Sequence, residues 1–253
     1  MMIPKTDDGR VLFAVPWQGK VVIGTTDTHV DHIDLEPLPL AEEIHFVLEH
    51  FNRYTNASIT KEDVLSVFVG LRPLVRSANA GSNISSLLSR DHTLVVSPSR
   101  LVTITGGKWT TYRKMAEDAV NNAVFVAKLD HTKCITKDLP IGDLGAAREL
   151  AAQLTLDEPM LGNYLDHEFA AFHHITYAIR VVDVVVAARI SYVRTVEDFL
   201  ARRSRLLFLD ARAAIQLAPS VATILQKELN WTNEEREAQL QSFIQLAQQY
   251  IIH

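Results

Sequence analysis

The alternation of apolar and polar positions predicts strands in the first part of this 253-residue chain. Residues 10–17 and 20–28 are short runs rich in β-branched residues, and Gln18-Gly19 separates them. A two-residue loop with glycine in second place is typical of a tight β-hairpin. Residues 92–107 repeat the arrangement around a Ser-Pro-Ser connection, which predicts a second hairpin. Between the hairpins, residues 62–75 are apolar and extended, because Pro73 disfavours a helical residue before it.

A helical period first appears over residues 40–54 and dominates the chain from Thr110 onward. One helix is predicted to run from about Thr111 to Leu129. After a loop with Pro140 and Gly142, nearly every segment suits a helix, with Thr195 and Thr232 as N-caps. These segments are residues 145–154, 168–179, 196–218, 221–229 and 233–251. The predicted fold class is α+β: an incomplete α+β domain over residues 1–133, then an all-α domain over residues 134–253.

Composition narrows the class of protein. Hydrophobic residues make up 47% and charged residues 22%, and the net charge is −5, so nothing favours nucleic acid as a partner. A single cysteine, Cys134, excludes an internal disulfide and fits a reducing compartment. The longest apolar run, residues 181–190, is too short to span a bilayer. We therefore expect a cytoplasmic protein, soluble or attached to a membrane surface.

The strongest candidate for chemistry is the turn after the second hairpin, where Gly106, Gly107 and Lys108 precede Thr110 and Thr111. Two glycines let the backbone approach a ligand closely, and the helix start and Lys108 supply positive charge. Such a turn suits an anion or the pyrimidine edge of a flavin. An ordinary strand-to-helix turn with a solvated lysine explains the pattern about equally well.

Two arginines are the second candidate. Arg72 and Arg90 each stand at an edge of apolar or loop structure, and a guanidinium binds phosphate or carboxylate through two parallel hydrogen bonds. For either arginine alone, a structural ion pair with a carboxylate such as Asp63 or Asp91 is the better interpretation. Asp27 at a strand end is expected to satisfy backbone donors in a turn.

The remaining clusters predict structure rather than chemistry. The histidines are scattered without a set of ligands, so we assign no metal site. The arginines of residues 202–212, together with Asp210, are expected to form a salt-bridged helix face.

Four motifs occur in order along the chain: GTTDT (24–28), GLRPL (70–74), SRDHTL (89–94) and TITGGKWTTYRKMAEDAV (103–120). In this order and spacing the chain resembles the FAD-dependent glycerol-3-phosphate dehydrogenases, and residues 194–214 resemble the helical C-terminal domain of that family. The resemblance covers nearly the whole chain and corresponds to the second half of a family member.

The resemblance implies a role for each matching residue. Gly106, Gly107, Lys108, Thr110 and Thr111 would face the flavin of FAD. Arg72 and Arg90 would contact glycerol 3-phosphate, and Arg72 and Lys108 would stand at the reacting centre. The implied reaction is hydride transfer from C2 of glycerol 3-phosphate to flavin N5, giving dihydroxyacetone phosphate. A membrane quinone, or oxygen in the related oxidases, would then accept the electrons, and the base that takes the hydroxyl proton is not identified.

One feature of the family does not occur in this sequence. The strand–GxGxxG–helix unit that holds the FAD pyrophosphate has no counterpart in it. We therefore expect the chain, as an expressed piece or a truncated reading frame, to be inactive alone and to bind FAD weakly or not at all. Unpaired sheet edges would favour a homodimer. The alternatives are the oxidase branch, separable by hydrogen peroxide production, and a non-enzymatic helical docking module, separable by capture of a partner without flavin.

Overall fold

The computed structural model describes residues 1–72, 91–140, 145, 149–150, 152–153 and 179–252. Contacts between residues divide the chain into two compact units. Unit 1 contains residues 1–26, 34–69 and 143–253, and unit 2 contains residues 27–33 and 70–142. Small antiparallel sheets followed by helices confirm the predicted α+β fold class. Most of the helices predicted over residues 145–154 and 168–179 lie outside the described residues.

Unit 1 begins with a three-stranded antiparallel sheet in the order β1 (Met2–Ile3), β2 (Leu12–Trp17), β3 (Lys20–Gly24). Gln18 and Gly19, with φ of 47° and 77°, form the two-residue loop between β2 and β3, which confirms the first predicted hairpin. Strand alternation turns Leu12 and Ala14 inward, where they form a small buried cluster with Ile3 and Phe51. Phe51 belongs to α1 (Ala41–Tyr54), the predicted amphipathic helix.

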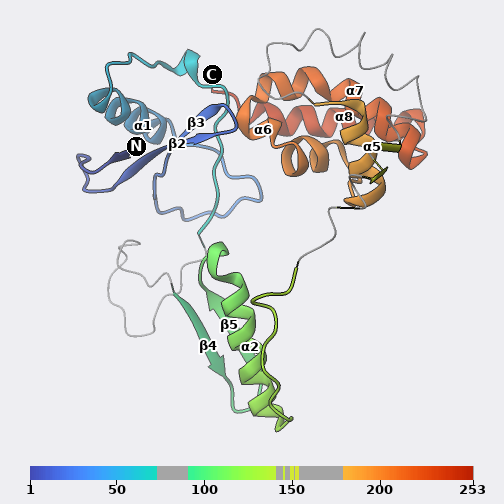
Figure 1. The fold of residues 1–253 in the computed structure, drawn as a ribbon. Helices are drawn as coiled ribbons and strands as arrows, with labels where there is room; N and C mark the ends of the chain where they lie inside the picture. Colours follow the sequence, from blue (N-terminus) through green and yellow to red (C-terminus); the bar gives the residue numbers. More distant parts are fainter. Residues whose placement is uncertain (73–90, 141–144, 146–148, 151, 154–178, 253) are drawn as a thin grey trace. The chain divides into compact units, whose positions relative to one another are not determined.

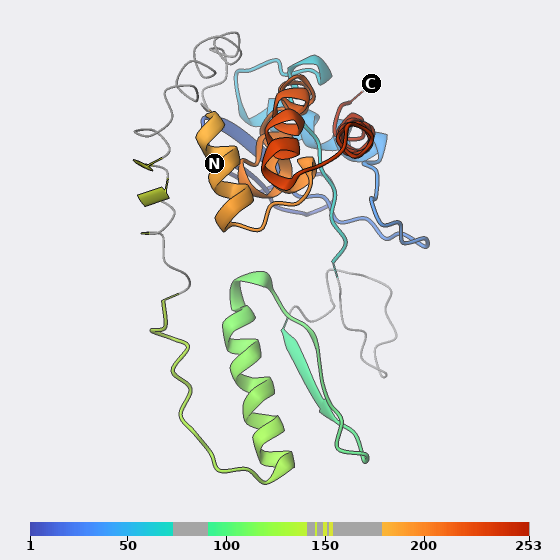
Figure 2. The same cartoon turned by 90° about the vertical axis from the view of Figure 1, so that its right-hand side faces the viewer.

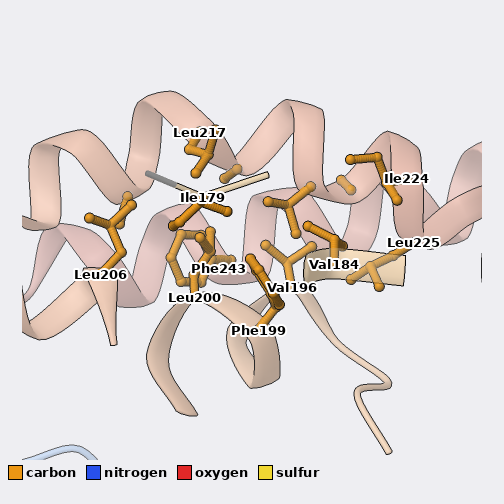
Figure 3. Packing of buried hydrophobic residues seen from close by; sticks show 14 of the residues in the cluster. Ile179, Val184, Val196, Phe199, Leu200, Leu206, Leu217, Ile224, Leu225 and Phe243 are labelled. Carbon is orange, nitrogen blue, oxygen red and sulfur yellow. The ribbon is translucent and has the colours of Figure 1, made fainter. Parts of the chain in front are cut away.

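The larger core of unit 1 is helical (Figure 1, orange to red). It is built from α5 (Val181–Ile190), the π-helical turn η5 (Asp198–Arg203), α6 (Leu206–Leu209), α7 (Ala211–Leu229) and α8 (Asn233–Gln248). The side chains labelled in Figure 3 pack between these elements, among them Val184, Leu200, Leu217, Leu225 and Phe243, none more than 1% exposed. Because each helix contributes an apolar face, the helices bury one continuous cluster.

An extended segment ties the first part of unit 1 to these helices. After the 3₁₀ turn η1 (Lys61–Asp63), the backbone N–H of Val67 donates to the carbonyl oxygen of Tyr250 at 2.9 Å. The hydroxyl of Ser66 donates to the carbonyl oxygen of Leu207 at 2.6 Å. The predicted extended segment is therefore wrong at Glu62 and Asp63, which belong to η1, whereas residues 64–72 form no helix and residues 73–75 lie outside the described residues.

The helix predicted over residues 196–218 is wrong as a single element. Arg205 has a φ of 63°, which ends the π-helical turn before α6 begins. Asp210 is extended and accepts a hydrogen bond from the backbone N–H of Ala213 at 2.9 Å, so it caps a new helix. Conversely, α7 continues through Pro219, where a break was predicted, because Ala218 and Val221 on either side are fully buried. The predicted caps at Thr195 and Thr232 are confirmed by reciprocal hydrogen bonds with the third residue after each.

The expected salt-bridged face over residues 202–212 is confirmed in part. Arg202 pairs with Glu197 at 2.6 Å and with Asp198 at 3.2 Å. Arg203 and Arg212 donate instead to backbone carbonyl oxygens, of Ser191 and Val64 respectively.

Unit 2 carries the second predicted hairpin, β4 (His92–Val96) and β5 (Val102–Gly106), and the helix α2 (Tyr112–Ala127). Residues of α2 contact β5, and both views show the helix running beside the hairpin (Figures 1 and 2, green). The 3₁₀ turn η3 (Trp109–Thr111) joins β5 to α2, so the α-helix starts at Tyr112. No residue of α2 is buried in this chain.

Within the part of the chain that the structure describes, no helix combines the length and the apolar character needed to cross a membrane.

Candidate flavin and substrate site

The candidate site is centred on the glycine loop, residues 106–108, where β5 passes into η3. Gly106 and Gly107 have φ of 75° and 86°, a left-handed backbone that residues with a side chain rarely adopt. Lys108 returns to an extended conformation, with φ of −131° and ψ of 148°. Two consecutive left-handed glycines thus begin the turn from β5 to the helix, and neither places a side chain between its backbone and a ligand.

The start of the helix fixes the other end of the loop. The backbone N–H and the hydroxyl of Thr111 both donate to the carbonyl oxygen of Lys108, each at 3.0 Å. Lys108 and Thr110 are exposed. Trp109 is 86% exposed and stacks on Tyr112, with 5.4 Å between ring centroids. The loop therefore presents a cation, a hydroxyl and an aromatic face from one held backbone. The flavin-facing role expected for Gly106, Gly107, Lys108, Thr110 and Thr111 stays a prediction.

A residue with a side chain at position 107 would adopt a strained backbone and would displace the Met115 thioether. A Cβ at this position would overlap Sδ of Met115, and it would lie 2.6 Å from Cε of Met115 and 3.2 Å from Cβ of His92. One side of Gly107 is thus filled by this chain, while Lys108 and Thr110 beside it are exposed. This arrangement fits a planar polar ligand lying over the loop, since hydrogen bonds from the loop and a positive charge from Lys108 could meet it.

Arg72 belongs to the same compact unit as the glycine loop and forms an ion pair. Its Nη1 lies 2.8 Å from Oδ2 of Asp27. The structural ion pair weighed for Arg72 therefore exists, and Asp27 is the carboxylate that forms it. Asp27, which was expected to satisfy backbone donors in a turn, thus also holds one side of the guanidinium. Arg90 lies outside the described residues.

Three residues next to the glycine loop were not singled out from the sequence. Nε2 of His92 lies 3.0 Å from Oδ2 of Asp118, and Nζ of Lys114 lies 2.8 Å from Oδ1 of the same carboxylate. The hydrogen bond from Lys114, helped by His92, lowers the pKa of Asp118 below its ordinary value. Lys114 and Asp118 stand four residues apart on α2, a spacing the sequence shows, but the pairing with His92 depends on the fold.

Comparison of the sequence with profiles of known families gives the class of protein to which the chain is similar. Residues 1–113 match the family profile described as "FAD dependent oxidoreductase", and residues 146–236 match "C-terminal domain of alpha-glycerophosphate oxidase". Both the domain with the glycine loop and most of the helical part therefore match domains of flavin-dependent oxidoreductases.

Similarity to individual proteins narrows this class to one kind of enzyme. The chain is 36% identical to "Glycerol-3-phosphate dehydrogenase SDP6, mitochondrial" of Arabidopsis thaliana, over 95% of this chain and 43% of that protein. It is 31% identical to the human mitochondrial glycerol-3-phosphate dehydrogenase, over 96% of this chain and 36% of that protein. A crystal structure of the glycerol-3-phosphate dehydrogenase from Bacillus halodurans, complexed with FAD, has the same fold, with a TM-score of 0.65 and 24% identity. That match covers 97% of this chain and 52% of the solved one.

These matches show that the chain belongs to the family of FAD-dependent glycerol-3-phosphate dehydrogenases. The resemblance inferred from the four motifs is thereby confirmed. The chain spans less than half the length of the curated relatives reported above.

Proposed function

We propose that this chain supplies the substrate side and the flavin-ring side of an FAD-dependent glycerol-3-phosphate dehydrogenase. The reaction is the oxidation of sn-glycerol 3-phosphate to dihydroxyacetone phosphate, with electrons passed on to a quinone. The observation that carries this proposal is the glycine loop: two left-handed glycines and an exposed lysine directly before a helix, in a chain of this family.

Each part of the loop has a task in this reaction. FAD supplies the acceptor of the hydride from C2. Gly106 and Gly107 allow the backbone to approach the ring, and Lys108 with the following helix start stabilises negative charge on its pyrimidine edge. Thr110 and Thr111 complete the flavin-facing surface. Stabilisation of the flavin requires only that the chain hold Lys108 and the helix start in place. The two hydrogen bonds from Thr111 to the carbonyl oxygen of Lys108 hold this backbone.

On the substrate side, we assign Arg72 and Arg90 to the phosphate and hydroxyl groups of glycerol 3-phosphate. A guanidinium held on one side by Asp27 keeps a fixed orientation and can donate in parallel to two phosphate oxygens. Arg72 orients the substrate at the reacting carbon. It does not accept the hydroxyl proton, because a guanidinium stays protonated at neutral pH.

The acceptor of the electrons defines a second candidate. The profile matched by residues 146–236 is named after an α-glycerophosphate oxidase, so the oxidase branch, with oxygen as acceptor, has an observation in its favour. Production of one hydrogen peroxide per substrate oxidised, without added quinone, would select the oxidase over the dehydrogenase.

The test compares this chain alone with a fusion in which a strand–GxGxxG–helix region of the solved relative precedes it. We expect the fusion to bind about one equivalent of FAD and to reduce a quinone analogue when glycerol 3-phosphate is added. The chain alone should bind little FAD, because the loop offers few contacts against the cost of association. A fusion that binds FAD but does not reduce the quinone analogue when glycerol 3-phosphate is added would contradict the proposal.

Two further properties are proposed with this function. Transfer to a quinone calls for association of the enzyme with a membrane surface, which flotation with vesicles would detect. The outer edges of the β1–β3 sheet, which pair with no further strand among the described residues, favour a homodimer, which light scattering would detect. The expected cytoplasmic location stays a prediction, and the plant and human relatives are mitochondrial by name.

A further inference from the structure

We propose that His92 and Asp118 are positioning residues for the glycine loop, holding it so that Lys108 faces the flavin from a fixed backbone. The proposal rests on the function proposed for that loop. It gives a role to a pair that lies beside the candidate site and that was not singled out from the sequence.

The pair joins the two elements that the glycine loop connects. His92 is the first residue of β4 and stands opposite Gly106, the last residue of β5, in the hairpin register. Asp118 lies in the second turn of α2. The 3.0 Å hydrogen bond between them closes a ring that runs from the hairpin through the loop to the helix and back.

The loop is packed inside this ring. His92 and Met115 border the same side of Gly107: a Cβ built there would lie 3.2 Å from Cβ of His92 and 2.6 Å from Cε of Met115. Met115 stands one helical turn before Asp118, so a shift of α2 along the hairpin moves the thioether against Gly107. The position of Gly107, and of Lys108 beside it, is therefore coupled to the His92–Asp118 distance.

The charge on Asp118 strengthens its hydrogen bond with His92 and fixes which oxygen accepts it. Lys114 occupies Oδ1 of Asp118, which leaves Oδ2 for His92, so the carboxylate is held at both oxygens. The side chains of His92 and Asp118 are 23% and 26% exposed, and a hydrogen bond to a carboxylate at such a site is stronger than one on an open surface.

The chain itself offers a matched control. Asp118→Asn keeps size and polarity but removes the charge that receives His92 and Lys114. Glu117→Gln makes the same change at the neighbouring position of α2, where the carboxylate pairs with Arg113 at 2.9 Å. His92→Gln retains an N–H donor for Asp118, whereas His92→Leu does not.

The first readout uses this chain without flavin. The Met115 methyl and the Gly107 amide are followed by NMR, with circular dichroism to verify folding. We expect Asp118→Asn and His92→Leu to shift both resonances. Glu117→Gln should leave them at the wild-type positions, and His92→Gln should keep them close to these positions. Unchanged resonances in both Asp118→Asn and His92→Leu would overturn the proposal.

The second readout uses the FAD-loaded fusion and its midpoint potential. If Lys108 is displaced, reduced flavin loses stabilisation. A tenfold loss lowers the potential of this two-electron couple by about 30 mV, and we expect Asp118→Asn, but not Glu117→Gln, to show a shift of this order. A shifted loop with an unchanged potential would overturn the link to the flavin. Failure of the wild-type fusion to bind FAD would overturn the proposed function, while the NMR comparison would still decide whether the pair positions the loop.

Discussion

At the scale of single residues, Gly107 shows how a missing side chain shapes the candidate site. Its φ of 86° costs a residue with a Cβ about 1–2 kcal/mol, and the new methyl would meet Met115 and His92. We expect Gly107→Ala to lower the free energy of unfolding of unit 2 by about that amount, measured by chemical denaturation of the chain.

Two comparisons separate strain from crowding at Gly107. A methyl group added at Gly70 would have nothing within 4 Å, and Gly70 has no left-handed φ, so Gly70→Ala should change stability by less than about 0.5 kcal/mol. Adding Met115→Ala to Gly107→Ala relieves the crowding only. If this double variant recovered the stability of Met115→Ala alone, backbone strain would be excluded as the cause.

The Asp8 carboxylate gives a prediction about pH. Hydrogen bonds from Arg10, the nearest at 2.5 Å, lower the pKa of Asp8 to about 2. A lowered pKa means that the contact stabilises the fold above the ordinary carboxyl pKa of 3.8, and that this contribution is lost as the pH falls toward 2. Carboxyl ¹³C NMR should find a midpoint near 2, and Arg10→Gln should return it toward 3.8. A midpoint near 3.8 in the wild type would exclude the contact in solution.

Arg72 tests the substrate side. Lysine keeps the charge at this position but loses the planar fork and the fixed hold of Asp27. In the FAD-loaded fusion we expect Arg72→Lys to raise KM for glycerol 3-phosphate by about tenfold or more, which is the range for loss of one charge-assisted hydrogen bond. Arg53→Lys, at a surface pair with Asp7 and Glu49 in unit 1, is the control and should leave KM unchanged.

At the scale of elements, Asp210 determines where α7 begins. Its carboxylate accepts the backbone N–H of Ala213, and without it the first turn of α7 loses a partner. We expect Asp210→Ala to lower the free energy of unfolding by about 1 kcal/mol, and Asp210→Asn, which keeps an acceptor oxygen, to cost only a few tenths. Equal losses in the two variants would show that the charge, and not the cap, matters.

Elements were predictable from the sequence wherever the signal is local. The Gln18-Gly19 loop, the face of α1, the Thr195 and Thr232 caps and the glycine loop each depend on residues within a few positions. The breaks at Arg205 and Asp210 were missed because the apolar pattern continues across them, and burial on both sides carried α7 through Pro219.

Partners that are distant in the sequence could not be predicted. Asp27 and Arg72 stand 45 residues apart, and His92 and Asp118 stand 26 apart. Spacing on the helix indicates the pair of Asp118 with Lys114, but it gives no sign of His92, and nothing in the spacing links Asp27 to Arg72. Only the fold of unit 2 selects among them.

At the scale of the whole molecule, the two units differ in how much they bury. The helices α5 to α8 enclose a continuous apolar core, whereas α2 has no buried residue and leaves Phe125 83% and Val120 60% exposed. A helix depends on tertiary packing for most of its stability. The hairpin and α2, which carry the candidate site, therefore have little of their own apolar surface removed from water in this chain.

This difference gives the last prediction. Hydrogen exchange of the isolated chain, followed by mass spectrometry, should find the amides of α7 and α8 protected on the order of a hundredfold or more over those of α2, because α2 opens without disrupting a core. Joining the strand–GxGxxG–helix region should slow exchange in α2 and in the glycine loop, and leave α7 and α8 unchanged. Equal protection of α2 and α7 in the chain alone would contradict this account. So would a proteolytic digest that removes the helices of residues 179–252 first and leaves the hairpin and α2 intact.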